Sequence, residues 1–275
     1  MTAFCTADVN YIARDLDPTE LVRPRSVEIL DGRTAELPGW RDCGFELVEH
    51  RSAVTDWDDD DEIARVHHPE LESIAAEMTG ADHALVSSHI KRNPDAAAHT
   101  HAQLAPIPFA HSDFAAGHDG FIRRIYVDGL PGPAAALERH GLDASAVADA
   151  RRIVILQFWR NLGPARMDYP LAFCDIGSVD IDQGRPFHVE NYAGTGATFD
   201  ALAIAAPEDG EPAHRWYVYP EMQPYEMVAF RTYDTDLVER GDIHFTPHCA
   251  VRDPEVQIGA PARSSIELRA TCIFD

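Results

Sequence analysis

The stretch PIPFAHSDF, residues 106–114, carries a histidine and an aspartate two positions apart, His111 and Asp113. In an extended strand, residues i and i+2 point to the same face, so the imidazole and the carboxylate would project side by side. A second histidine, His248, lies much later in the chain and could complete the group. Two histidines and one carboxylate leave the opposite coordination positions of a metal open, as non-haem Fe(II) oxygenases require. The pattern predicts a metal centre.

The histidine that completes this group is not settled by spacing, because His244 is a rival for His248. The two residues are four apart in HFTPHCA. An even separation could place both side chains on one face of a strand. Pro247 lies between them and can bend the chain, so both possibilities remain open.

Two other pairs offer metal-binding side chains. His188 and Glu190 also stand two residues apart, but RPFHVENYAGTG lacks strand character, so we do not expect a rigid site there. His99 and His101 lie in a polar loop ahead of the apolar strands, where a surface position or a contact between a lid and the substrate is expected.

A carboxylate-binding pair follows His248 in RSSIELRA. Arg263 can bind a planar carboxylate through two parallel hydrogen bonds, and Ser265 can face the same way to add a third. Arg269 shares this face and is the alternative clamp. Arg160, in FWRN, could hold a substrate carboxylate, and Trp216 is a candidate wall of the substrate pocket.

The elements that must position these residues change in character along the chain. SVEILDGR and GFELVEH alternate like half-buried strands, and the acidic run WDDDDEIARV is typical of a helix N-terminus. Pro69, Glu70 and Gly80 bound a predicted helix, and His67 and His68 beside its start are expected to be structural. Residues 93–108 predict a loop or lid.

Helical turns are expected between residue 117 and residue 152, and strands dominate from residue 153. This order predicts an α+β protein with a mainly β core, in which a helical first part packs around an antiparallel sandwich or barrel. We expect a single domain over residues 1–275. Residues 1–105 would supply N-terminal strands, a helix and the lid, and residues 106–275 the core with inserted helices.

The composition excludes several classes of partner. The formal net charge is −23, which opposes binding to nucleic acid or to anionic membrane surfaces. No secretory signal or membrane-spanning run is visible, and five scattered cysteines without CxxC spacing argue against a disulfide framework or a structural zinc site. A cytoplasmic protein is expected.

Ordered motifs along nearly the whole chain resemble one family of oxygenases. It includes the 7-alpha-methoxylation subunit of cephamycin biosynthesis, aspergillic acid hydroxylase and gibberellin desaturase-like proteins. The matching pieces are GFELVEH, HHPE, TGA, HIKR, HSDF, FWRNLGP, PLAFCDIGSV, HRWYVYPEM, YEMVAFRTYD, PHCAV and RSSIELRA. The resemblance implies a double-stranded β-helix (jelly roll), Fe(II) ligands His111, Asp113 and His248, and a 2-oxoglutarate clamp from Arg263.

The function that this resemblance implies is Fe(II)/2-oxoglutarate-dependent oxidation of an unactivated C–H bond by O₂. Hydroxylation, desaturation or oxidative cyclisation of a small, amino-acid-derived secondary metabolite would be the outcome. The alternatives are a metal-binding jelly-roll oxidase that does not use 2-oxoglutarate, a partner subunit of a biosynthetic enzyme, and a non-enzymatic small-molecule binder. Only the first function predicts both tight Fe(II) binding and succinate formation.

Overall fold

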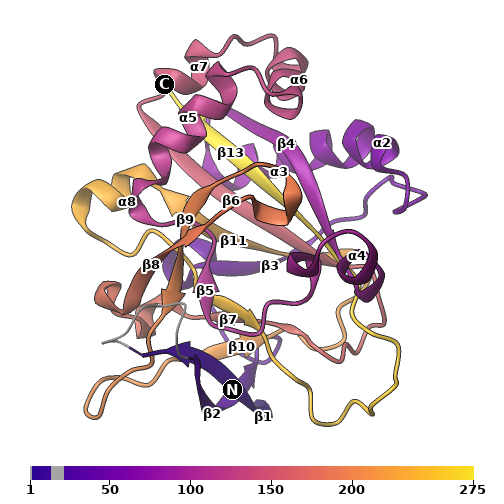
Figure 1. Ribbon diagram of the computed structural model, residues 1–275, viewed down its shortest axis with the longest axis vertical. Coiled ribbons are helices and arrows are strands. Elements are labelled where there is room, and N and C mark those ends of the chain that lie inside the picture. Colours follow the sequence, from indigo (N-terminus) through magenta and orange to yellow (C-terminus); the bar gives the residue numbers. More distant parts are fainter. Residues whose placement is uncertain (1, 14–21) are drawn as a thin grey trace.

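The computed structural model describes residues 2–13 and 22–275, and the remaining positions of the predicted N-terminal strand region lie outside it. Within the described residues, two sheets form the centre of the molecule (Figure 1). The eight-stranded sheet contains, in spatial order, β1 (Ala3–Ile12), β2 (Val22–Asp31), β10 (Trp216–Val218), β7 (Leu171–Cys174), β12 (His248–Ala250), β5 (His111–Ser112), β9 (Phe199–Ile204) and β8 (Gly184–Val189). The five-stranded sheet contains β3 (Phe45–Glu49), β11 (Glu226–Asp234), β6 (Arg152–Asn161), β13 (Ser265–Phe274) and β4 (His83–Arg92).

Helices are short and flank these sheets. They are α1 (Trp40–Cys43), α2 (Asp60–Glu62), the π-helix η1 (Ile63–His67), α3 (His68–Thr79), α4 (Pro94–His99), α5 (Asp119–Val127), α6 (Pro131–His140), α7 (Ser145–Ala148) and α8 (Thr235–Arg240). Single 3₁₀ turns are η2 (Ala102–Leu104), η3 (Ala116–His118), η4 (Ile176–Ser178), η5 (Ile181–Gln183) and η6 (Tyr192–Gly194). In Figure 1, α5, α6 and α7 gather at the end where the C-terminus lies, and β1 and β2 lie at the opposite end.

Strand β13 shows how the five-stranded sheet divides its two faces. Ile266, Leu268 and Ala270 pack in the apolar cluster under α3, on the outer face. The alternating residues Glu267 and Arg269 therefore point to the inner face, toward the eight-stranded sheet. A strand with one apolar face usually turns its polar face to water, whereas here the polar face is buried.

The inner face is apolar at both ends of the five-stranded sheet. At one end, Phe230 on β11 packs against Phe173 on β7, so the two sheets meet through aromatic side chains. At the other end, Ile153 and Ile155 of β6 pack with residues of α5, α6 and α7. The polar inner residues of β13 lie between these two clusters, which places a polar pocket inside the protein.

Most sequence-based expectations for the elements are confirmed. Helix α3 has Pro69 in its first turn and ends at Gly80, whose left-handed φ of 75° suits a residue without a Cβ. The acidic run begins α2, where the Asp59 carboxylate accepts hydrogen bonds from the N–H groups of Asp61 and Glu62. The segment 93–108 contains α4 and η2 rather than only loop.

Two expectations about strands need correction. RPFHVENYAGTG was expected to lack strand character, yet Gly184–Val189 forms β8, because it pairs along its whole length with β9. The first part of the chain also contributes more sheet than expected, since β1 and β2 extend one sheet and β3 and β4 form both edges of the other. The eight-stranded sheet is mixed, because β10 pairs with β2 in parallel, whereas the strand pairs of the five-stranded sheet are antiparallel.

Candidate metal centre

Strands β5 and β12 place two histidines directly opposite each other. His111 and His248 are cross-strand partners in an antiparallel pair, so both side chains point to the same face of the eight-stranded sheet. Each strand begins shortly after a proline, Pro108 or Pro247. Since proline has no N–H to donate to a sheet, the ladder starts only beyond it, and this fixes where each histidine enters the sheet.

The carboxylate of Asp113 completes a compact group with these histidines. Its Oδ1 lies 3.9 Å from Nε2 of His111 and 3.8 Å from Nε2 of His248. One ligand atom from each residue lies within 4.8 Å of the other two. Three atoms at such distances can surround one metal ion after small adjustments, because metal–ligand bonds of about 2.1 Å are needed.

Backbone contacts orient both imidazoles for metal binding. Nδ1 of His111 lies 2.8 Å from the carbonyl oxygen of Phe109, and Nδ1 of His248 lies 3.0 Å from that of Thr246. A carbonyl can only accept, so each Nδ1 carries the proton and each neutral ring keeps the lone pair on Nε2. Both lone pairs face Asp113, which is how metal-binding histidines are normally held.

The protonation states also suit coordination. Burial lowers the pKa of His111 to about 3, and the neighbouring His248 contributes. Burial likewise lowers the pKa of His248. Burial alone would raise the pKa of Asp113, but the charge of Arg269 and the two imidazoles lower it overall. The group therefore contains two neutral imidazoles and an ionised carboxylate, as a divalent metal requires.

Arg269 donates hydrogen bonds to the other carboxylate oxygen of Asp113, Oδ2. Its Nη2 and Nε donate to Oδ2 of Asp113 at 2.8 and 3.2 Å. Oδ1 is thereby turned toward the histidines, and the guanidinium is committed to Asp113. Of the two arginines that the sequence offered as a carboxylate clamp, Arg269 is thus engaged elsewhere, which favours Arg263.

Arg263 is a buried cation with few partners. Its Nη1 donates to the carbonyl oxygen of Tyr169 at 3.1 Å, its Nε has no hydrogen-bond partner, and no carboxylate pairs with it among the described residues. Burial, together with the charge of Arg92, lowers its pKa to about 10, so it is still charged at neutral pH. A buried, unpaired guanidinium is costly unless an anion binds to it.

Further unpaired polar atoms lie on the same face. Ser265 Oγ, Trp159 Nε1 and Gln157 Oε1 are buried without hydrogen-bond partners. Ser265 pairs across the sheet with Asn161, and Gln157 pairs with Arg269, so these positions belong to the inner face. Buried polar groups in native proteins are nearly always satisfied, and a set of this kind indicates a polar ligand.

The pocket that holds these groups is small and highly charged. Arg92, His111, Asp113, His248, Arg263 and Glu267 line it together with Ile107 and Leu171, around a free volume of about 10 Å³. Glu267 Oε1 accepts from Nη2 of Arg92 at 2.9 Å and lies 3.7 Å from Nη2 of Arg269. Burial would raise the pKa of Glu267, but both arginines lower it overall.

Comparison with known proteins identifies the family. A family model described as "Oxidoreductase/YMDC permease-like domain" matches residues 10–273, nearly the whole chain. The chain belongs to this family. In the described part of this family member, no helix is both long and apolar enough to cross a membrane.

Curated relatives of this family member carry oxygenase names. Alpha-ketoglutarate-dependent dioxygenase phiK of Fungal sp. (strain ATCC 74256) is 26% identical over 269 residues, covering 97% of this chain and 88% of phiK. Hydroxylase/desaturase efuI of Hormonema carpetanum is 28% identical over 244 residues, covering 84% of this chain and 77% of efuI. The resemblance drawn from the ordered motifs is confirmed by these relatives.

A solved structure has a similar fold. The iron and alpha-ketoglutarate-dependent endoperoxidase NvfI, in one variant, superposes with a TM-score of 0.75 and 19% sequence identity, covering 100% of this chain and 98% of NvfI. At this identity the likeness shows the fold. The eight- and five-stranded sheets with flanking helices are therefore a fold that this chain shares with NvfI.

Two residues predicted to bind substrate lie away from this pocket. Arg160 pairs across the sheet with Ile266, on the outer face, and donates to the carbonyl oxygens of His50 and Pro224 at 3.2 and 2.6 Å. Trp216 packs with Cys249, the neighbour of His248 whose side chain points to the opposite face. The alternation of strand faces explains both positions.

The rival histidines also lie outside the group. His244 is buried beside Tyr233, with a ring-centroid distance of 5.7 Å, and neither of its ring nitrogens has a hydrogen-bond partner. His188 is exposed on β8 and pairs with Asp200 at 2.8 Å. His99, on α4, pairs with Asp95 at its surface. The structure thus brings His248, and not His244, to His111.

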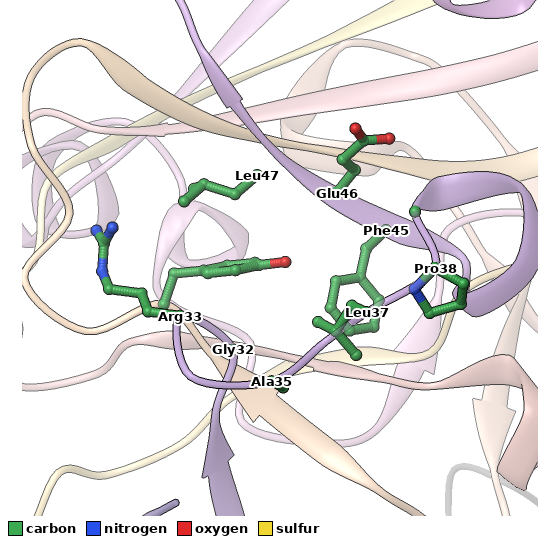
Figure 2. Close-up of a pocket in the computed structure, with 10 residues that line it drawn as sticks. Gly32, Arg33, Ala35, Leu37, Pro38, Phe45, Glu46 and Leu47 are labelled. Atoms are coloured by element: carbon green, nitrogen blue, oxygen red, sulfur yellow. The ribbon is translucent and has the colours of Figure 1, made fainter. Parts of the chain in front are cut away.

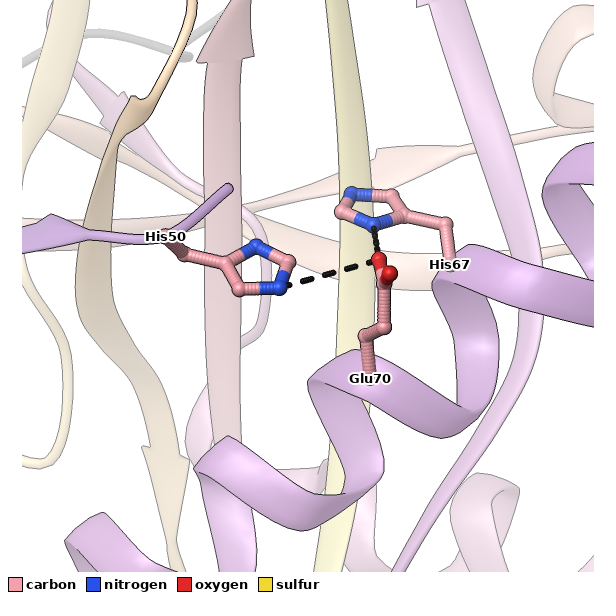
Figure 3. A group of neighbouring side chains, drawn as sticks. All are labelled: His50, His67 and Glu70. Atoms are coloured by element: carbon pink, nitrogen blue, oxygen red, sulfur yellow. Dashed lines mark hydrogen bonds and ion pairs between the residues drawn. The ribbon is translucent and has the colours of Figure 1, made fainter. Parts of the chain in front are cut away.

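A second histidine–histidine–carboxylate group lies at the start of α3 (Figure 3). Nδ1 of His67 donates to Oε2 of Glu70 at 2.9 Å, and Nε2 of His50 lies 3.7 Å from the same oxygen. Nη2 of Arg160 donates to Nδ1 of His50 at 2.8 Å. An arginine cannot accept, so the neutral His50 ring must hold its proton on Nε2, where a metal would need the lone pair.

A second hollow, shown in Figure 2, is larger than the pocket of His111, Asp113 and His248 but has no comparable group of metal-binding side chains. Its volume is about 430 Å³, and the lining residues are Gly32, Arg33, Ala35, Leu37, Pro38, Gly39, Phe45, Glu46, Leu47 and Tyr219. None of these is a histidine or cysteine, and Arg33 already pairs with Glu226 through two hydrogen bonds. Size alone does not make it the functional site.

Arg92 and Glu267 line the pocket but were not predicted from the sequence, and neither were Gln157 and Trp159, whose unpaired polar atoms lie on the same inner face. The signal for Glu267 was available, because it follows Ser265 by two positions on one strand. The same alternation places Trp159, rather than its neighbour Arg160, on the inner face. Arg92 had no such signal, since it comes from β4 and only sheet pairing brings it opposite Ser265.

Proposed function

We propose that this chain is an Fe(II)/2-oxoglutarate-dependent oxygenase, with His111, Asp113 and His248 as the iron ligands. The observation that carries the proposal is the unpaired guanidinium of Arg263, buried in the pocket of the three ligands. A metal alone would leave this cation without an anion. A dicarboxylate that binds the metal at one end and Arg263 at the other satisfies both.

The charge balance of the pocket supports a doubly negative cosubstrate. Arg92, Arg263 and Arg269 carry three positive charges, and Asp113 and Glu267 carry two negative ones. Adding Fe(II) would raise the net charge from +1 to +3 in a buried space. The two negative charges of 2-oxoglutarate would restore +1, which lowers the cost of burying the ion.

Each residue then has a distinct task. His111 and His248 present Nε2 lone pairs, and Asp113 presents one oxygen while Arg269 neutralises the other. Arg263 and Ser265 bind the distal carboxylate. When bound, iron with 2-oxoglutarate and O₂ supplies the oxidation of an unactivated C–H bond, with succinate and CO₂ as coproducts.

The side chains of the pocket also exclude water, since Leu171 and Ile107 close its apolar sides. We propose that the two sheets form a double-stranded β-helix, that residues 1–275 are one domain, and that a small secondary metabolite is hydroxylated, desaturated or cyclised. The oxygenase names of phiK and efuI support this class of reaction. The polar pocket between the two sheets supports the proposed architecture.

The test is anaerobic addition of Fe(II) and then 2-oxoglutarate, followed by visible absorption. A weak charge-transfer band is expected for the chain and for Arg231→Lys, and its loss is expected for Arg263→Lys, with iron still bound. Arg231 is the matched control, because it too is buried, bonds to backbone carbonyls and has an unpaired Nε. If iron binds but neither the charge-transfer band nor succinate appears, the result would favour an oxidase that does not use 2-oxoglutarate. Absence of iron binding would overturn the metal site itself.

A further inference from the structure

Two segments cover the pocket from outside the sheets. The first cover segment, residues 93–108, contains α4 and η2, and its Ile107 lines the pocket. The second cover segment, residues 190–198, contains η6. The two segments meet where the backbone N–H of Ala193 donates to Oε1 of Gln103 at 2.6 Å. Neither segment belongs to a sheet. The backbone N–H of Ala250 donates to the carbonyl oxygen of Ile107 at 2.8 Å, and the other contacts described below involve side chains.

Arg92, the last residue of β4, bonds to both cover segments and to the pocket. Its Nη1 donates to the carbonyl oxygens of Gln103 and Ala105 at 2.6 and 3.3 Å. Its Nη2 donates to the phenol oxygen of Tyr192. Nη2 and Nε both donate to Oε1 of Glu267, at 2.9 and 3.1 Å. All five N–H groups of the guanidinium are thus in use.

This arrangement continues to the metal ligand. Glu267 lies between Arg92 and Arg269, and Arg269 holds Oδ2 of Asp113. An unbroken chain of charged contacts therefore runs from the cover segments to the carboxylate that would bind the metal. Low effective dielectric in a buried site makes such contacts strongly dependent on one another.

Two further observations are explained by a covered state that opens and closes. The free volume in the pocket is about 10 Å³, whereas small-molecule sites usually offer roughly 300–1,000 Å³. The backbone of Ala193 has a positive φ of 49°, a strained conformation for alanine that persists only where contacts enforce it. Gln103 supplies such a contact in the covered state.

We propose that Arg92 is a positioning residue, which couples closure of the two cover segments to the orientation of Asp113 at the metal. This inference rests on the proposed metal site. Coupling is reciprocal, so metal binding must stabilise the closed segments as much as closure strengthens metal binding. A role in folding alone would not produce this reciprocity.

The experiment uses Co(II) as the probe, with hydrogen–deuterium exchange and an absorption titration on the full chain. In the wild type, Co(II) should slow exchange in both cover segments. Tyr192→Phe removes one contact that involves no metal ligand, and it should weaken Co(II) affinity about fivefold or more while abolishing that slowing. Arg92→Lys keeps the charge without the five-donor fork, and it should weaken affinity about 10- to 100-fold.

Arg33→Lys is the matched control, since Arg33 also binds a glutamate, Glu226, through two hydrogen bonds but lies in the hollow of Figure 2. It should leave Co(II) affinity and exchange in the cover segments unchanged. Wild-type affinity in Tyr192→Phe, or exchange in the cover segments that is indifferent to Co(II), overturns the coupling. Failure of Co(II) to bind the wild type instead overturns the proposed metal site, so the two failures are distinguishable.

Discussion

The group His111–Asp113–His248 and the group His50–His67–Glu70 each contain two imidazoles and one carboxylate. In both, one ligand atom of each residue lies within 4.8 Å of the others. The difference lies in their neighbours. Backbone carbonyls accept from Nδ1 of His111 and His248, which leaves both Nε2 lone pairs facing the carboxylate.

In the second group, the ring nitrogens nearest the carboxylate carry protons instead. Arg160 donates to His50, and the Glu70 carboxylate accepts from His67, from the Ser52 hydroxyl at 2.6 Å and from the backbone N–H of Ala53 at 2.7 Å. Protons therefore take the place that a metal would occupy. The comparison teaches that surrounding hydrogen bonds, more than residue types, decide whether such a group can bind a metal.

Removing one histidine from each group tests whether only the first group binds a metal. His111→Ala should weaken Fe(II) or Co(II) binding by more than about 100-fold, because loss of a ligand exceeds the effect of losing a neighbour of a ligand. His50→Ala should leave the metal affinity unchanged. Anaerobic metal titration measures both, and equal losses in the two variants would contradict the distinction.

If the second group binds protons, the free energy of unfolding should depend on pH through His67. Burial lowers the pKa of His67 to about 4 despite its hydrogen bond to Glu70, whereas an unfolded chain has a histidine pKa near 6.5. Stability from this residue is complete above about pH 6.5 and is lost as the pH falls toward 4, at a cost of about 3 kcal/mol. Urea unfolding at pH 7 and pH 4.5 measures it.

His67→Gln is the control for that pH dependence. Glutamine can still donate to Glu70 but does not titrate, so the variant should lose less stability on acidification than the wild type. An identical loss in both proteins would assign the effect to other groups.

A substitution at Arg269 tests whether a residue that contacts a metal ligand affects metal affinity. Arg269→Met leaves Asp113 without its partner for Oδ2, so the carboxylate can rotate and its charge is less well balanced. Metal affinity should fall about 10- to 100-fold, which corresponds to about 1.4–2.7 kcal/mol. Titration with Co(II) measures the change, and unaltered affinity would show that Arg269 does not orient the ligand.

Arg160 offers the smallest expected effect. Arg160→Met leaves the carbonyl oxygens of His50 and Pro224 without their donor, so the free energy of unfolding should fall by about 1–2 kcal/mol. Urea denaturation measures this, and metal affinity should be unchanged. Normal stability with a raised KM for substrate would instead support the role in substrate binding that the sequence suggested.

Much of the site was accessible from spacing and residue type. His111, Asp113 and His248 were predicted as a group, and the structure brings them together. The choice between Arg263 and Arg269 was not accessible, because both lie on one face of β13 and only the position of Asp113 in space engages Arg269. The position of Trp216 away from the pocket was not accessible either, because the sequence does not show which face of β10 meets the metal.

The sequence by itself determined local features: the capped helix α3, the alternation along β13, and the family to which the ordered motifs belong. These depend on backbone geometry and on residues close in the chain. The tertiary structure decided which face of β13 is buried, how Arg92 reaches Glu267, and which nitrogen of each histidine carries a proton. Those outcomes depend on partners from distant segments, and no local pattern records which partner will arrive.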